Sequence, residues 1–172
     1  RVADLTTSRK ISPSIIAHVV NDATPRWGGG FALAVARAWP NAQQDFVDWI
    51  RDDATRLHLG STHAFEIDAC ISLFHMVAQH GYKKAAFPTL RYSALEMCLE
   101  ALSEFALDRS ATVHMPRIGC GQAGGNWSVV AELIENHLCQ RGVSVTIYDL
   151  PEERSKWNDR NPQRSLFDSL DN

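Results

Sequence analysis

The sequence has no hydrophobic run long enough to cross a membrane, and no signal peptide opens it. It also lacks an excess of positive charge, because its formal net charge is −3 at pH 7. A chain of this charge has no general electrostatic attraction for DNA, RNA or an anionic membrane. We therefore expect neither a membrane protein nor a general nucleic-acid-binding protein.

The cysteines are scattered, and no C-x-x-C pair occurs. The sequence places its four cysteines far apart, at Cys70, Cys98, Cys120 and Cys139. The seven histidines show no metal-ligand spacing with the cysteines or with each other. This pattern predicts reduced thiols, no bound metal, no cofactor and a cytoplasmic setting, with a nuclear one as the alternative.

The composition is that of an ordinary globular domain. The chain has 172 residues, of which 45% are apolar and 22% are charged. This length favours a single domain with a substantial core, which we place at residues 1–150. Residues 151–172 are polar and are expected to form a tail outside that core. Since the chain starts at Arg1 without a methionine, we expect it to be part of a longer protein.

Strand-like and helix-like segments alternate along most of the chain. Strands are predicted at 14–20, 61–67, 71–79, 111–118 and 143–148, and helices at 31–39, 41–56, 91–107 and 129–138. The segments 61–67 and 71–79 are separated by only three residues, which predicts a hairpin. The whole pattern predicts an α/β fold with a mixed, mostly parallel sheet and helices on both faces.

Two glycine-rich loops each join a predicted strand to a predicted helix. The first runs from Asn21 to Gly30, and the second contains Gly119, Gly121, Gly124 and Gly125. A loop without side chains lets an anion approach the backbone, and the following helix offers unpaired N–H groups. We therefore expect both loops to meet around one diphosphate; a plain strand-to-helix turn is the alternative.

Two alternatives concern the second loop. The spacing Gly119-x-Gly121-x-x-Gly124 also fits a dinucleotide-binding fingerprint, with Asp149 as the ribose-binding acid, although only one strand follows it. Cys120 lies next to a helix start, where its thiol pKa can fall, and His114 is then its only candidate base.

The two tryptophans next to the loops can either cover a ligand or pack into the core. We expect Trp27 to face a ligand, because the residues around it are polar, and Trp127 to pack against the core. His18, His75 and His114 interrupt predicted strands and are expected to be core or pocket-edge residues.

Four segments together resemble the macro domain, an ADP-ribose-binding module with a three-layer α/β/α fold. They are Asp4-Leu-Thr, Ile16-Ala-His-Val-Val-Asn-Asp followed by Trp27-Gly-Gly-Gly, Met76-Val-Ala-Gln-His80, and Val113-His-Met-Pro-Arg-Ile-Gly119. The resemblance spans about residues 2–151. It is most similar to the branch with the macro domain of a poly-ADP-ribose-activated chromatin remodeller and the terminal ADP-ribose glycohydrolase.

The resemblance implies a role for individual residues. Asp4 accepts a hydrogen bond from the adenine, with the Leu5 backbone nearby, and Asn21 and Asp22 hold the distal ribose. The residues implied to surround that ribose and the phosphates are Trp27, Gly28, Gly29, Gly30, Gly119, Cys120, Gly121, Gln122, Ala123, Gly124, Gly125 and Asn126.

The resemblance also bears on catalysis. Hydrolases of this branch use a lysine in the loop after the hairpin, which Lys83 or Lys84 matches, and an aspartate in the diphosphate loop. That aspartate is absent here, where the sequence is Gln122-Ala-Gly124. Three functions therefore stay open: hydrolysis of ADP-ribose esters on acidic side chains, a non-catalytic reader of ADP-ribose or poly-ADP-ribose, and an NAD(P)-dependent oxidoreductase.

The expected partner is ADP-ribose or an ADP-ribosylated macromolecule. The tail segment Gln163-Arg-Ser-Leu-Phe167 also loosely resembles peptides that dock into bacterial sliding clamps, so a protein partner of the tail is a second expectation.

Overall fold

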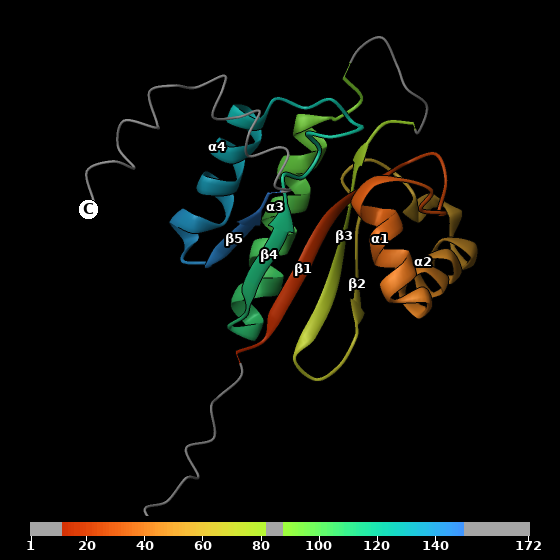
Figure 1. Cartoon of the computed structure of the whole chain (residues 1–172), viewed down its shortest axis with the longest axis horizontal. Helices are drawn as coiled ribbons and strands as arrows, with labels where there is room; N and C mark the ends of the chain where they lie inside the picture. The colour runs from red at the N-terminus through yellow and green to blue at the C-terminus, as the bar shows by residue number, and fades with distance from the viewer. Residues whose placement is uncertain (1–11, 82–87, 150–172) are drawn as a thin grey trace, which may run out of the picture.

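Strand β1, Ser14–Asn21, lies at the centre of a five-stranded sheet (Figure 1). The computed structural model describes residues 12–81 and 88–149. The strands follow the order β2-β3-β1-β4-β5, with β2 at Thr62–Glu66, β3 at Ile71–Gln79, β4 at Thr112–Pro116 and β5 at Val145–Tyr148. All neighbouring strands pair in parallel except β2 and β3. The predicted mixed, mostly parallel sheet is confirmed.

Strands β2 and β3 form the predicted hairpin. The Asp68 carboxylate accepts hydrogen bonds from the backbone N–H groups of Cys70, at 2.7 Å, and Ile71, at 2.9 Å. A carboxylate that binds the backbone two and three residues onward stabilises a tight turn. The turn therefore sets the register in which the two strands pair.

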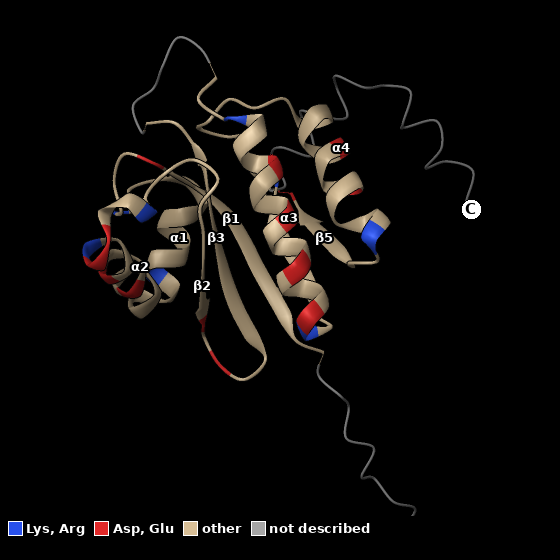
Figure 2. Ribbon diagram, turned by 180° about the vertical axis from the view of Figure 1, so that it is seen from behind, with Lys and Arg blue, Asp and Glu red and all other residues tan. Residues whose placement is uncertain are grey.

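Two helices cover each face of the sheet, as Figures 1 and 2 show from opposite sides. On one face lie α1, Gly30–Ala38, and α2, Pro40–Asp52; on the other lie α3, Tyr92–Arg109, and α4, Trp127–His137. Short 3₁₀ turns follow α2 and α4 at Ala54–Arg56 and Cys139–Arg141. Pro40 separates α1 from α2 as expected, and it also opens α2, where its missing N–H costs nothing.

Each helical layer has its own core. The face of α3 that the sequence predicted, Leu95, Leu99, Leu102 and Ala106, is fully buried against the sheet. On the other face, α1 and α2 bury Val35, Phe46 and Ile50 against Leu73 and Val77 of β3. Central strands are thus apolar on both sides, as expected for a sheet covered on both faces.

The solvent side of α3 carries negative charge. Glu96, Glu100 and Glu104 are exposed at four-residue intervals, which places them on one helix face. Figure 2 shows them as acidic bands along α3, with few basic residues nearby.

Within 12–81 and 88–149, no helix has the length and hydrophobicity needed to cross a membrane.

Candidate functional site

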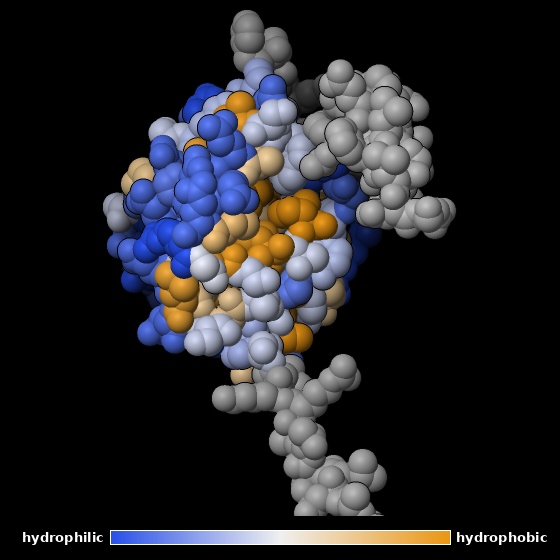
Figure 3. All heavy atoms as spheres, turned by 90° about the vertical axis from the view of Figure 1, so that its left-hand side faces the viewer, coloured by the Kyte–Doolittle hydropathy of each residue, from blue (hydrophilic) through white to orange (hydrophobic). Residues whose placement is uncertain are grey.

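A cavity of about 1340 Å³ lies at the carboxyl ends of the parallel strands. Both glycine loops line it, the first through Trp27, Gly28, Gly29 and Gly30 and the second through Gly119, Gly121, Gln122 and Ala123. The expected convergence of the two loops is therefore confirmed. Ligands of open α/β sheets bind outside the carboxyl ends of strands, which is where this cavity opens. Viewed from the side of β5 and α4, the molecule shows a hollow in which apolar residues gather (Figure 3).

Side chains from β1 and α2 fix the first loop. The Asn21 side-chain oxygen accepts hydrogen bonds from the N–H groups of Ala23, at 3.0 Å, and Thr24, at 2.9 Å. Gln43 of α2 accepts from the Trp27 N–H at 2.8 Å and donates to the Pro25 carbonyl at 2.7 Å. The loop is therefore shaped before any ligand arrives, which lowers the entropy cost of binding.

The first loop leads directly into the N-terminus of α1. Gly29 precedes this helix and no side chain caps it. The first N–H groups of a helix have no partner within the helix and attract anions. Gly30, Phe31 and Ala32 of this first turn line the cavity. Gly30 has φ +58°, so a side chain at this position would be strained. The start of α1 therefore has the free N–H groups and the helix-dipole end that suit an anion.

The second loop divides into a part that lines the cavity and a part that packs. A Cβ atom added to Gly125 would lie 2.4 Å from a Leu90 methyl carbon and 2.9 Å from the Gly119 carbonyl oxygen. The Gly125 N–H donates to that same carbonyl at 2.9 Å. A Cβ atom added to Gly124 would lie 3.5 Å from Pro88. These two glycines let the loop turn back over Leu90.

This packing places part of the predicted site outside the cavity lining, and the ligand contacts predicted there stay a prediction. Cys120, Gly124, Gly125 and Asn126 do not line the cavity. The Asn126 side chain instead accepts the Ser128 N–H at 2.9 Å and so caps α4. Because α4 is capped and α1 is not, α1 rather than α4 offers its N-terminus to a ligand. Cys120, the alternative nucleophile, is half-buried and directs its sulfur to the Ile118 carbonyl at 3.3 Å.

Asp22, which was also predicted to hold the distal ribose, lies outside the residues that line the cavity. Its carboxylate accepts hydrogen bonds from the Gly81 N–H and from His80 Nδ1, both at 2.8 Å. Partial burial acts to raise its pKa, but these hydrogen bonds and the nearby His80 charge outweigh that and lower it. Asp22 therefore ties the end of β1 to the end of β3, while Asn21 lines the cavity.

The Trp27 ring is turned inward, although Trp27 belongs to the residues that line the cavity, and its predicted contact with a ligand stays a prediction. It is 5% exposed and packs against His18, His75 and Phe46, with ring centres 5.2, 4.7 and 5.3 Å away. The loop turns this ring inward because the α2 side of the sheet offers an aromatic pocket. Trp127 is half-buried, with the Arg117 guanidinium 5.1 Å from its ring centre, which fits the expected packing role.

Two buried histidines lie beneath the cavity. His18 and His75 face each other on β1 and β3, and His18 Nε2 lies 2.7 Å from His75 Nδ1. Burial lowers the pKa of His18 to about 3 and holds that of His75 well below its usual range, so both rings are neutral at pH 7. His18 also lines the cavity. The sequence identified these histidines as core or pocket-edge residues but did not predict their pairing.

The cavity wall at the ends of β4 and β5 contains an ion pair. Arg117 donates to both Asp149 oxygens, with Nη2 to Oδ2 at 2.7 Å. Tyr148 is 56% exposed, and its hydroxyl lies 2.9 Å from His114 Nδ1. Asp149, the acid that the dinucleotide-binding alternative assigns to a ribose, is thus paired with Arg117. The strand order also differs, because β1 lies between β3 and β4 here, whereas the dinucleotide-binding fold has the order 3-2-1-4-5-6. The oxidoreductase alternative does not fit this topology.

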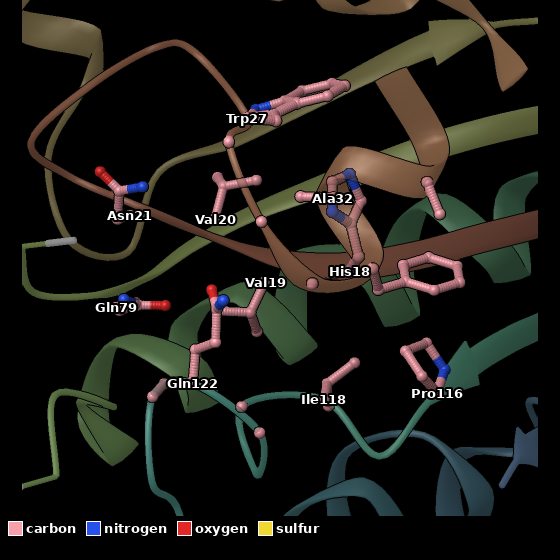
Figure 4. A pocket seen from close by; sticks show the side chains of 18 of the residues that line it. His18, Val19, Val20, Asn21, Trp27, Ala32, Gln79, Pro116, Ile118 and Gln122 are labelled. Carbon is pink, nitrogen blue, oxygen red and sulfur yellow. The ribbon is translucent and has the colours of Figure 1, made fainter. Parts of the chain in front are cut away.

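Uncharged side chains line the other end of the cavity. Figure 4 shows the carboxamides of Asn21, Gln79 and Gln122 on one side, with His18 and Pro116 on the other. Asp149 is the only carboxylate among the described lining residues. Within the described ranges no cluster of three or more His, Cys, Asp or Glu side chains is suited to a metal ion. Asp4, Leu5, Lys83 and Lys84 lie outside the described residues.

No known family model matches the chain. Among the curated proteins that resemble it, two match it over part of their own length. Chromodomain-helicase-DNA-binding protein 1-like of Mus musculus is 33% identical over 153 residues, which cover 83% of this chain and 16% of the mouse protein. The ADP-ribose glycohydrolase OARD1 of Homo sapiens is 35% identical over 69 residues, covering 40% of this chain and 45% of the human protein. The chain therefore spans less than half the length of each.

A solved structure matches most of this chain and most of its own chain. The macrodomain protein from Streptomyces coelicolor is 37% identical, with a TM-score of 0.69, and the match covers 81% of this chain and 89% of that one. With this identity over this coverage, the chain belongs to the macro domain family.

Proposed function

We propose that this domain binds ADP-ribose and hydrolyses ADP-ribose esters on acidic side chains. The observation that carries the binding is the meeting of two glycine loops, 89 residues apart when counted from Gly30 to Gly119, around one cavity with an uncapped helix start. A diphosphate has the charge and the small cross-section that such a backbone site accepts. The similarity to a human protein named ADP-ribose glycohydrolase supports the choice of ligand.

The two arms of the cavity differ in a way that suits the two ends of ADP-ribose. Near Pro116, beside the Arg117–Asp149 pair, Phe31, Ile118 and the exposed Tyr148 add apolar and aromatic surface, which accepts an adenine ring. At the other end the carboxamides of Asn21 and Gln79 offer donors and acceptors for ribose hydroxyls. In this arrangement the diphosphate lies at the start of α1, between the two arms.

Hydrolysis requires a group that activates water or attacks the sugar. Asp149 is held by Arg117 and directly follows Tyr148, the β5 partner of Pro116, so it lies away from the carboxamide end where the ester would lie. We therefore assign this step to Lys83 or Lys84, which follow Gly81 in the chain, or to the bound diphosphate acting on water. If neither acts, the domain is a reader, and the resemblance to a chromatin protein favours that alternative.

Calorimetric titration with ADP-ribose and with NAD tests the binding. We expect ADP-ribose to bind with micromolar affinity, about −8 kcal/mol, and NAD to bind at least tenfold more weakly. The reason is that NAD has a planar nicotinamide on its distal ribose, at the end of the cavity where the carboxamides of Asn21 and Gln79 favour hydroxyl groups. Tight NAD binding without ADP-ribose binding would overturn the proposal.

Incubation with glutamate-ADP-ribosylated protein tests the hydrolysis. We expect the wild-type domain to remove the modification, and Lys83→Ala or Lys84→Ala to slow removal by roughly a hundredfold or more, as for loss of a catalytic base or nucleophile. Lys156→Ala, in the predicted tail, is the matched control. If the modification survives for hours at high protein concentration, the reader is correct; if removal is unchanged in both variants, neither lysine acts.

A further inference from the structure

Asp22 and His80 form a hydrogen-bonded pair where β1 and β3 end. His80 Nδ1 lies 2.8 Å from Asp22 Oδ2, and the other Asp22 oxygen accepts the Gly81 N–H, also at 2.8 Å. Because an ionised carboxylate only accepts hydrogen bonds, the pair keeps the proton of the neutral His80 ring on Nδ1. Nε2 then carries a lone pair, and no hydrogen bond to another described residue occupies it.

The backbone holds this pair in place. The Asp22 N–H donates to the Gln79 carbonyl at 3.0 Å, and the His80 N–H donates to the Thr89 carbonyl at 2.9 Å. The Asp22 side chain is 16% exposed, whereas that of His80 is 61% exposed. The carboxylate is therefore fixed and largely shielded, while the ring that it orients is open to solvent.

The pair lies directly beyond the carboxamide end of the cavity. Asn21 and Gln79, which line that end, are register partners on β1 and β3, and Asp22 and His80 are the residues that follow them. Neither Asp22 nor His80 lines the cavity itself. In the proposed reaction, however, the ribose is inside the cavity and the modified protein outside it, because a protein does not fit into about 1340 Å³. The ester between them therefore lies at the end where the pair is found.

A purely structural role explains this arrangement less well. An exposed pair of this kind adds little to stability, and the bond from Gly81 to Asp22 already joins the two strand ends. An aspartate that accepts from Nδ1 of a histidine whose Nε2 is open is the arrangement that orients a ring as a base. Histidine is also the side chain suited to accept and release a proton near neutral pH.

We propose that His80, oriented by Asp22, is the general base that activates water for hydrolysis of the ester. This inference rests on the proposed function and supplies a proton acceptor for the route in which the bound diphosphate acts on water. The water oxygen bonds to the anomeric carbon of the distal ribose, and the bond from that carbon to the ester oxygen breaks. Its electron pair leaves with the carboxylate, while the proton of the water passes to His80 Nε2 and then to solvent.

One base is sufficient for this step because of the leaving group. The pKa of a glutamate carboxyl group is about 4, so the carboxylate leaves at neutral pH without needing a proton from an acid. The route therefore does not require the aspartate of the diphosphate loop, in whose place this chain has Gln122-Ala-Gly124.

Single-turnover release of ADP-ribose from glutamate-ADP-ribosylated protein tests the base. His80→Ala should lower the rate by about a hundredfold and leave the affinity for free ADP-ribose unchanged, because a general base acts on the reaction and not on binding. Imidazole added to the solution should restore part of the rate in His80→Ala, since it replaces the missing ring. His58→Ala, at an exposed histidine outside the cavity, is the matched control and should keep the wild-type rate.

Asp22→Asn tests the positioning role of the carboxylate. The asparagine oxygen can still accept the Gly81 N–H, but its N–H₂ group then faces His80 Nδ1 and shifts the ring proton to Nε2. The rate should fall by about tenfold or more at unchanged ADP-ribose affinity. In the His80→Ala background, Asp22→Asn should have little further effect on the rate, because residues that act as a unit are not additive.

An unchanged rate in His80→Ala would overturn the base, and so would a loss of rate that imidazole does not restore. In both cases hydrolysis by the wild-type protein would stand. If the wild-type protein releases no ADP-ribose from glutamate, the proposed hydrolysis fails and the inference fails with it.

Discussion

Replacing Gly121 by glutamate is expected to weaken ADP-ribose binding by about a hundredfold and to leave the fold intact. Gly121 is exposed at the cavity wall, and a Cβ atom added to it would meet nothing within 4 Å. The new side chain is therefore accommodated without strain. A negative charge about 5 Å from the diphosphate costs about 3 kcal/mol at an effective dielectric constant near 20. That cost corresponds to the hundredfold loss of affinity.

Gly121→Gln is the matched control, because it adds a side chain of the same size without the charge. We expect Gly121→Gln to reduce affinity much less than Gly121→Glu. The loss of affinity in Gly121→Glu should shrink as ionic strength rises, because salt screens the repulsion between the two negative charges, whereas the loss in Gly121→Gln should not depend on salt in this way. Calorimetric titration at low and high salt measures both effects, and thermal unfolding checks the fold. Wild-type affinity in Gly121→Glu would show that the diphosphate does not lie at this part of the second loop.

Sequence patterns were sufficient for the elements and for the edge at which the cavity forms. Apolar periodicity located β1, β3 and the buried face of α3, because these segments bury the residues that their spacing predicts. The two glycine loops were found for a similar reason. Each follows a parallel strand, and the carboxyl ends of parallel strands meet at one edge of the sheet.

The sequence patterns could not predict which glycines border the cavity and which pack against other residues. Gly121 and Gly125 lie in one short motif, yet one borders the cavity and the other packs against Leu90, 35 residues earlier in the chain. That contact depends on where the segment before α3 crosses the loop, which no local pattern records. The same limit applies to Asp22, whose partners at His80 and Gly81 come from the end of β3.

The direction of the side chains in the first loop could also not be predicted from the sequence. Polar neighbours favoured an outward Trp27, but its ring packs against Phe46 in the core on the α1 and α2 side of the sheet. Its partners His18 and His75 are 57 residues apart and meet only because β1 and β3 pair in register. Polar residues within apolar strands are a usable signal that a pair of this kind exists. The partner is known only once the strand order is known.

Acidification from pH 6.5 to pH 5 is expected to lower the free energy of unfolding by about 3 kcal/mol through the His18–His75 pair. In the folded protein burial lowers the pKa of His18 to about 3 and that of His75 well below 6.5. In the unfolded chain both regain a pKa near 6.5 and bind protons as the pH falls. The unfolded state therefore holds more protons across this window, so stability rises with pH and is lost as the pH falls.

Urea unfolding at intervals between pH 7 and pH 5 measures this effect above the range in which most carboxyl groups titrate. The double variant His18→Met and His75→Met removes both titrating rings, and its flexible apolar side chains adapt to the space they leave. Its unfolding free energy should change little over the window. His58→Gln, at an exposed histidine, should keep the wild-type slope. If wild-type stability is the same at pH 6.5 and pH 5, the two rings are not held neutral by burial.

Because His18 lines the cavity and Trp27 packs on the same pair, charging either ring also disturbs the packing on which the first glycine loop rests. ADP-ribose affinity should therefore fall in the same pH window as stability in the wild type, and a flat affinity profile beside a steep stability profile would separate the pair from the loop.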